Sequence, residues 1–138
     1  MKDIRIRKAT KDDVSLIAEV VAMAIGDDIA TYYCGENYHQ VLKELASMET
    51  SQYSYNNVLI AEVDGVKAGA AVAYNGADLQ MLREATLKVI SEYRGEELKI
   101  TEDETDASEY YLDSLGVLPE YRGCGVGAKL ILALKEIA

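Results

Sequence analysis

Residues 122–127 read Arg122-Gly123-Cys124-Gly125-Val126-Gly127, and they lie between an apolar run of β-type residues and an amphipathic helix. Three glycines in five positions allow successive backbone N–H groups to turn toward one point. The helix predicted for residues 127–138 directs the positive end of its dipole at that point. The stretch therefore predicts a site for a phosphate or pyrophosphate, with Arg122 and Lys129 as nearby cations.

Two other phosphate-binding loops fit this stretch poorly. A P-loop needs Gly-Lys followed by Ser or Thr, whereas here Ala128 separates Gly127 from Lys129. The dinucleotide fingerprint needs Gly-x-Gly-x-x-Gly and a later strand with a ribose-binding acid, and the sequence offers neither. A plain strand-to-helix turn requires neither three glycines nor Arg122, so a phosphate-binding role is favoured.

Upstream, the N-terminal half of the chain predicts one strand and two helices. Residues 4–7 alternate apolar and basic side chains, as in a half-buried strand. Thr10 is the expected N-cap of a helix that ends at Gly26. A second helix is expected from Asn37, where Asn37 and Gln40 have the spacing of a capping box.

The next segment predicts a hairpin, and the elements after it complete a mixed fold. Residues 58–63 and 66–74 flank Asp64-Gly65, which is a strong signal for a tight turn. The small side chains of residues 68–73 indicate a close neighbour, most simply a packed helix. A helix over 79–93, a strand over 110–117 and a helix over 127–138 follow. The order predicts an α/β (α+β) domain around one sheet.

Composition narrows the possible functions. The 138 residues are 49% hydrophobic, so we expect one domain over residues 1–138. The net charge of −10 argues against nucleic acid and anionic membrane as partners, and it favours a cationic substrate. No apolar run reaches membrane-span or signal-peptide length, which indicates a cytoplasmic protein.

The sequence does not predict a metal site or a nucleophilic hydrolase. Cys34 and Cys124 are too few for a disulfide scaffold or a zinc site. The acidic stretch 95–109 lacks the spacing of a calcium loop, and it is expected to be solvated. Any Ser-His or Cys-His hydrolase would depend on His39, the one histidine.

Residues 115–127 resemble the acyl-CoA signature of the GNAT superfamily of N-acetyltransferases. That signature is Arg or Gln, two residues, Gly, one residue, then Gly or Ala, and it corresponds here to Arg122, Gly125 and Gly127. The preceding Val-x-Pro-x-Tyr over residues 117–121 is typical of bacterial members. The opening residues 4–13 also resemble the start of such domains. The resemblance implies a mixed, mostly antiparallel central sheet flanked by helices.

The resemblance also implies the cosubstrate acetyl-CoA, with no metal. Backbone N–H groups of the loop would hold the pyrophosphate, and the strand before it would bind the pantetheine arm, much as a strand edge binds a peptide. The residues assigned to the cofactor are Leu115, Gly116, Val117, Arg122, Gly123, Cys124, Gly125, Val126, Gly127 and Ala128.

The implied reaction is attack of a primary amine of a small molecule or peptide on the thioester. Asp113 is the first candidate for the base, and Glu109 is the second; a surface role for Asp113 fits the sequence equally well. The Val117 N–H region is the expected donor to the developing oxyanion. Tyrosines in the region where the family shapes its acceptor pocket are Tyr32, Tyr33, Tyr38, Tyr53 and Tyr55, most of them expected to be packing residues.

The family fold normally continues beyond the last predicted helix, so we expect residues 1–138 to be an incomplete N-acetyltransferase domain that lacks the C-terminal part of the fold. A strand over 110–117 would then leave an unpaired apolar edge, which suggests a homodimer. Two alternatives stay open: a non-catalytic CoA-binding or interaction module of the same fold, and a binder of another nucleotide phosphate.

Overall fold

A computed structural model describes residues 3–94 and 110–137, in which four strands form one antiparallel sheet in the order β1-β2-β3-β4. The strands are β1 (Ile4–Lys8), β2 (Val58–Val63), β3 (Val66–Asn75) and β4 (Tyr110–Val117). The α-helices are α1 (Val14–Ile25), α2 (Asp27–Cys34), α3 (Tyr38–Ser47), α4 (Leu79–Arg94) and α5 (Val126–Ile137). Short 3₁₀ turns are η1 (Lys11–Asp13), η2 (Tyr55–Asn57), η3 (Gly76–Asp78) and η4 (Pro119–Tyr121).

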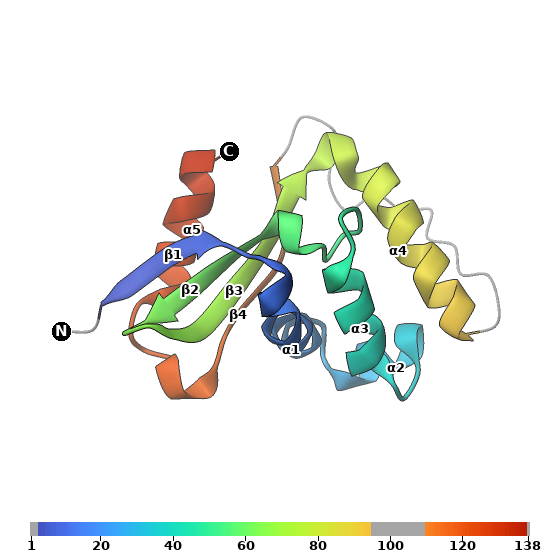
Figure 1. The fold of residues 1–138 in the computed structure, drawn as a ribbon, viewed down its shortest axis with the longest axis horizontal. Coiled ribbons are helices and arrows are strands. Elements are labelled where there is room, and N and C mark those ends of the chain that lie inside the picture. Colours follow the sequence, from blue (N-terminus) through green and yellow to red (C-terminus); the bar gives the residue numbers. More distant parts are fainter. Residues whose placement is uncertain (1–2, 95–109, 138) are drawn as a thin grey trace.

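Helices cover both faces of the sheet (Figure 1). On one face, side chains such as Ile60 and Val72 pack into a core with α1, α3 and α4. On the other face, Ala71 and Ala73 pack against the buried side of α5, which includes Leu130. Burial on both faces explains why β2 and β3 are almost continuously apolar instead of alternating.

The predicted hairpin and the strand over 110–117 are confirmed, and the helix predicted over 79–93 is confirmed and extends to Arg94. Asp64 and Gly65 both adopt positive φ, at 50° and 83°, as a tight two-residue hairpin turn requires. The small side chains of β3 do lie under helices, but at Gly69 the closest neighbour is a strand. A Cβ there would lie 2.7 Å from the Gly116 carbonyl oxygen of β4.

Two expectations for the helices before the hairpin were wrong. The chain forms an additional short helix, α2, between Gly26 and Gly35, whose φ values are 87° and 82°. Its eight residues include Thr and two Tyr, so helix propensity alone gives little signal. The Asn37 side chain makes no capping bond; the Asn37 carbonyl instead accepts from the N–H groups of Gln40 and Val41.

The expected cap at Thr10 is confirmed, and it leads into an ion-pair cluster around a buried carboxylate. The Thr10 and Asp13 side chains form a reciprocal capping box around η1. Asp13 is fully buried, and its carboxylate accepts two hydrogen bonds from Arg7, at 2.8 and 3.0 Å. Lys67 lies 2.7 Å from Asp13 Oδ1. The cluster therefore ties β1, η1 and β3 together.

Candidate active site

The glycine-rich loop runs into the first turn of α5, whose leading backbone N–H groups find no acceptor inside the helix. Gly123 and Gly125 have φ values of 85° and 86°, and a Cβ at either position would meet no atom within 4 Å. The first turn of α5 is closed by the bond from Lys129 N–H to the Gly125 carbonyl. The N–H groups of residues 126–128 therefore have no acceptor within the helix, so the loop and the start of α5 can bind an anion.

Strand β4 is the edge of the described sheet, and its backbone at Leu115 and Val117 faces away from β3. The bond from Leu118 N–H to the Ala68 carbonyl, at 2.7 Å, marks one hydrogen-bonded pair of this ladder. In an antiparallel ladder such pairs alternate with pairs whose backbone groups point outward. The register Leu115↔Ala71 and Val117↔Gly69 places these two residues in the outward set.

Side-chain contacts join this strand edge to the loop. Arg122 Nε donates to the Val117 carbonyl at 3.0 Å, which fixes the loop against the end of β4. Gly127 packs close to the side chains of Leu115 and Val117. The Val126 side chain is buried in the core under the sheet, so only its backbone can face a ligand.

The other residues assigned to the cofactor lie at the same end of β4. Gly116 faces α1, where a Cβ would lie 3.0 Å from Val20 Cγ1. Cys124 is partly buried beside the α5 core, and Ala128 is in the first turn of α5. The structure thus brings the strand residues and the loop residues onto one continuous surface.

Asp113 occupies a β-bulge. Val72 pairs with Ser114 and Ala73 pairs with Leu112, so Asp113 is the extra residue of β4. A β-bulge interrupts the alternation of side chains and so changes the direction in which the side chain of the extra residue points. Asp113 Oδ2 accepts a hydrogen bond of 2.7 Å from the hydroxyl of Tyr74, which belongs to the core shared with α1, α3 and α4. Asp113 therefore points to that face of the sheet, whereas Glu109 lies outside the described residues.

Two residues that the sequence analysis did not select hold Asp113 in place. Tyr74 is buried, and its hydroxyl also accepts from Gln52 Nε2 at 3.1 Å. Burial, together with the charge and hydrogen bond of Asp113, holds the pKa of Tyr74 far above its ordinary value, so the phenol stays protonated as a donor. A tyrosine in an otherwise small-residue strand is the one signal in the sequence that marks Tyr74.

Asp113 lines a pocket of about 360 Å³ between α2, α3, α4 and β4. Tyr33 and Tyr53 line it as well, which places two of the five predicted tyrosines there. Arg83 is also in its wall and is 6% exposed. The remaining lining residues are Ile25, Ile29, Cys34, Leu42, Gln52, Thr86, Leu87 and Ile90. This pocket is the candidate acceptor site because it contains the candidate base.

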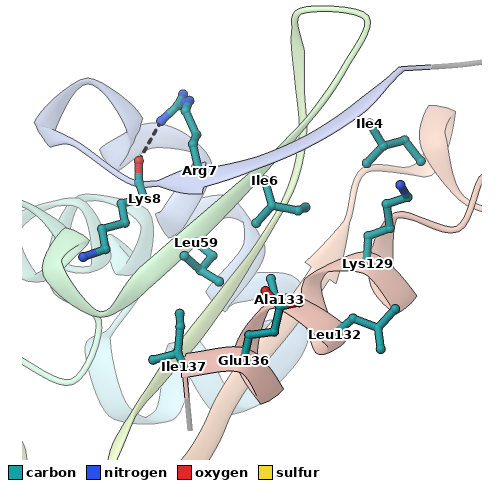
Figure 2. Close-up of a pocket in the computed structure, with 10 residues that line it drawn as sticks. All are labelled: Ile4, Ile6, Arg7, Lys8, Leu59, Lys129, Leu132, Ala133, Glu136 and Ile137. Atoms are coloured by element: carbon teal, nitrogen blue, oxygen red, sulfur yellow. Dashed lines mark hydrogen bonds between the residues drawn. The ribbon is translucent and has the colours of Figure 1, made fainter.

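A second hollow, of about 540 Å³, lies between β1 and α5 on the opposite face of the sheet (Figure 2). Figure 2 shows Ile6 and Leu59 from the strands beside Ala133 and Ile137 from α5. The sheet separates this groove from Asp113, since Leu59 belongs to the α5 core. The groove is therefore not part of the candidate active site.

Comparison with known proteins identifies the family. The model of the acetyltransferase (GNAT) family matches residues 26–138. The chain belongs to this family. Its GNAT fold is confirmed by a crystal structure described as an acetyltransferase, which is 34% identical with a TM-score of 0.80. That match covers 97% of this chain and 74% of the other.

Two further solved structures show the same fold. An N-acetyltransferase from Staphylococcus aureus Mu50 is 25% identical over 97% of this chain and 76% of its own, with a TM-score of 0.80. The aminoglycoside N-acetyltransferase AAC(6')-Iy, solved with CoA, is 17% identical over 99% of this chain and 68% of its own, with a TM-score of 0.50, and shows the fold alone. No curated protein matches the sequence.

Acetyl transfer from acetyl-CoA is the reaction class of the GNAT family. Across residues 3–94 and 110–137, no three His, Cys, Asp or Glu side chains gather as metal ligands would. No helix in this part of the chain combines the length and apolarity of a membrane span.

Proposed function

We propose that this GNAT protein transfers the acetyl group of acetyl-CoA to a primary amine bound in the Asp113 pocket. The observation that carries the proposal is the arrangement along β4. The backbone groups of Leu115 and Val117 that point away from β3 lie just before the glycine-rich loop. Asp113 lies on the same strand and lines a pocket. One strand thus connects a cofactor surface to an acceptor site.

The residues on this surface suit acetyl-CoA, which supplies the acetyl group as an activated thioester. The N–H groups of the loop and of the first turn of α5 would bind its pyrophosphate. The outward N–H groups of Leu115 and Val117 and the outward Leu115 carbonyl would bind the amides of its extended arm, as an edge strand binds a peptide. A Cβ at Gly123 or Gly125 would project into open space, so the loop leaves room for the ligand.

The chain's own residues would then prepare the amine. Asp113 would accept a proton from the acceptor ammonium, directly or through water, which makes the nitrogen nucleophilic. Tyr74 donates to Asp113 Oδ2 and so keeps the carboxylate in one orientation. The outward N–H of Val117 is the donor available to the carbonyl oxygen of the thioester as negative charge develops there. As the amide C–N bond forms, the C–S bond would break, and the departing thiolate would take up the second proton that the amine nitrogen loses.

Calorimetry followed by turnover assays tests this function. Acetyl-CoA should bind to the purified chain more tightly than ATP, and Arg122→Glu should abolish the binding because it reverses the charge beside the loop. Lys43→Glu is the matched control, since Lys43 is an exposed base on α3. No heat with acetyl-CoA from a folded wild-type sample would contradict the proposal.

Turnover distinguishes an enzyme from a binding module. Release of CoA thiol with a panel of primary amines would support catalysis, whereas tight binding without any thiol release would favour the non-catalytic module.

A second copy paired along β4 would occupy the edge that the pantetheine arm needs. Sedimentation with and without acetyl-CoA would show whether the cofactor and self-association compete.

A further inference from the structure

We infer that the acceptor is a compact monoamine with an apolar body, and not a polyamine or another polycation. This inference rests on the proposed function, because it concerns the acceptor pocket of that reaction. The high negative charge of the chain favours cationic acceptors in general, but the side chains in the pocket wall are more selective than the net charge.

Most of the residues that line the pocket have aliphatic, aromatic or thiol side chains. Eight of its twelve lining residues are aliphatic, tyrosine or cysteine side chains, and four are polar. Leu42 and Ile90 are 1% and 5% exposed, so they form the rigid part of this wall. Burying a CH₂ group of a ligand against such a wall is favourable by an amount that corresponds to about fourfold in binding.

The polar residues of the wall offer few groups to a second hydrophilic end of the acceptor. Thr86 Oγ1 donates to the Leu82 carbonyl at 2.9 Å and accepts from the Gln52 N–H at 2.8 Å. The Gln52 side chain donates to the Tyr74 hydroxyl at 3.1 Å. These hydrogen bonds within the protein engage the Thr86 hydroxyl and the Nε2 group of the Gln52 side chain.

The described lining residues include one charged side chain of each sign, Asp113 and Arg83. Asp113 is the one carboxylate among the lining residues that the structure describes, and it attracts the reacting amine. Arg83, on α4, contributes a positive charge that is 6% exposed. A second ammonium in the pocket would lose its hydration against apolar side chains.

A series of amines tests the inference, with CoA thiol release as the measurement. Butylamine, pentylamine and hexylamine differ by one CH₂ each, and kcat/KM should rise about fourfold per step until the pocket is filled. Putrescine matches pentylamine in length but has an ammonium in place of the terminal methyl group. Pentylamine should exceed putrescine in kcat/KM by about tenfold or more, as expected for an unpaired charge in an apolar site. Equal or better turnover of putrescine would overturn the inference.

A pocket variant gives an independent test. Ile29 lines the pocket and is 52% exposed, so a polar substitution there should not prevent folding. Ile29→Asp adds a second carboxylate and should shift the putrescine-to-pentylamine ratio by about tenfold toward putrescine, whereas Ile29→Asn should produce no such gain. An unchanged ratio in Ile29→Asp would count against the inference. Binding of acetyl-CoA without turnover of any amine would also overturn it, whereas absence of acetyl-CoA binding would mark failure of the proposed function itself.

Discussion

The hydroxyl of Tyr74 on β3 donates a 2.7 Å hydrogen bond to Oδ2 of Asp113 on β4, across the bulge between the two strands. The contact joins a buried phenol to the carboxylate in the wall of the candidate acceptor pocket. Because Gln52 donates to the same phenol oxygen, the Tyr74 proton is directed toward Asp113. The candidate base is thus oriented by two residues distant from it in sequence.

Removing the Tyr74 hydroxyl should impair catalysis more than cofactor binding. In Tyr74→Phe, Asp113 loses the donor that orients it, so kcat should fall about tenfold, which is a fraction of the roughly hundredfold or more that acid–base catalysis contributes. KM for acetyl-CoA should not change, and stability should fall by about 1 kcal/mol for the lost hydrogen bond. Steady-state kinetics checks the first two expectations, and urea unfolding checks the third.

The control for this variant is Tyr93→Phe. Tyr93 is an exposed tyrosine whose hydroxyl donates to Glu44 Oε1 at 3.3 Å, away from the pocket wall. Its kcat should stay at the wild-type value. If Tyr74→Phe also keeps the wild-type kcat, Tyr74 does not position a catalytic carboxylate.

The loop glycines should be needed for acetyl-CoA binding beyond their effect on folding. Gly125 has a φ of 86°, so Gly125→Ala should cost about 1 kcal/mol of stability. It should also weaken acetyl-CoA binding about tenfold or more, because relief of the strain turns the N–H groups away from one point. Calorimetry with acetyl-CoA gives the affinity, and thermal unfolding gives the stability.

Gly65→Ala is a control with matched backbone strain. Gly65 has a φ of 83° in the β2–β3 hairpin turn, and a Cβ there also meets no atom within 4 Å. Its stability cost should equal that of Gly125→Ala, while acetyl-CoA affinity should stay unchanged. Equal affinity in both variants would indicate that the loop does not bind the pyrophosphate.

These relationships show which parts of the site can be predicted from sequence. The glycine-rich loop and the helix that follows it are contiguous in the sequence. The anion-binding role of the loop can therefore be predicted from the order of its residues. The outward orientation of Val117 depends on the phase of the β3–β4 ladder, which residue order does not determine.

The position of Asp113 shows the same limit more clearly. Simple alternation places Asp113 and Ser114 on opposite faces of a strand. The bulge instead turns Asp113 toward Tyr74, and nothing in residues 110–117 marks a bulge at that position.

The short helix α2 was missed for a local reason, since the acids Asp27 and Asp28 after Gly26 are its main signal.

The buried carboxylate of Asp13 should make stability depend on acidic pH. Burial alone would raise the pKa of Asp13, but hydrogen bonds from Arg7, Lys67 and the Thr10 backbone hold it far below its ordinary value. The unfolded chain binds a proton there near pH 4, whereas the folded chain does so only at much lower pH. This contribution to stability is therefore complete above about pH 5 and is lost as pH falls below about 4.

Asp13→Asn isolates that contribution. At neutral pH it should destabilise the protein by about 2 kcal/mol, because the charge-assisted hydrogen bonds from Arg7 are weakened, although Arg7 keeps Glu62 as a partner at 3.2 Å. The difference from wild type should stay constant between about pH 5 and 8 and narrow below about pH 4, as measured by urea unfolding across pH. Asp12→Asn, at the adjacent exposed position, is the control. A difference that widens on acidification would contradict this account.

The contact between Gly69 and Gly116 should couple stability to cofactor binding. A Cβ at Gly69 would lie 2.7 Å from the Gly116 carbonyl oxygen and 3.3 Å from Val117 Cα, and both are backbone atoms. Gly69→Ala should therefore displace β4 and destabilise the protein by about 2 kcal/mol. Because Leu115 and Val117 belong to the displaced strand, acetyl-CoA affinity should fall as well.

Gly116→Ala separates this effect from a general intolerance of β4 to added volume. Its Cβ would meet Met23 Cε at 3.3 Å, the end of a flexible side chain on α1, and Val20 Cγ1 at 3.0 Å, a side-chain atom of a buried valine that would have to shift slightly. The cost should stay below about 1 kcal/mol, and acetyl-CoA affinity should change little. Chemical unfolding and calorimetry on both variants test the contrast. If Gly116→Ala proves the more disruptive of the two, the close approach of β3 and β4 is not what fixes the strand edge.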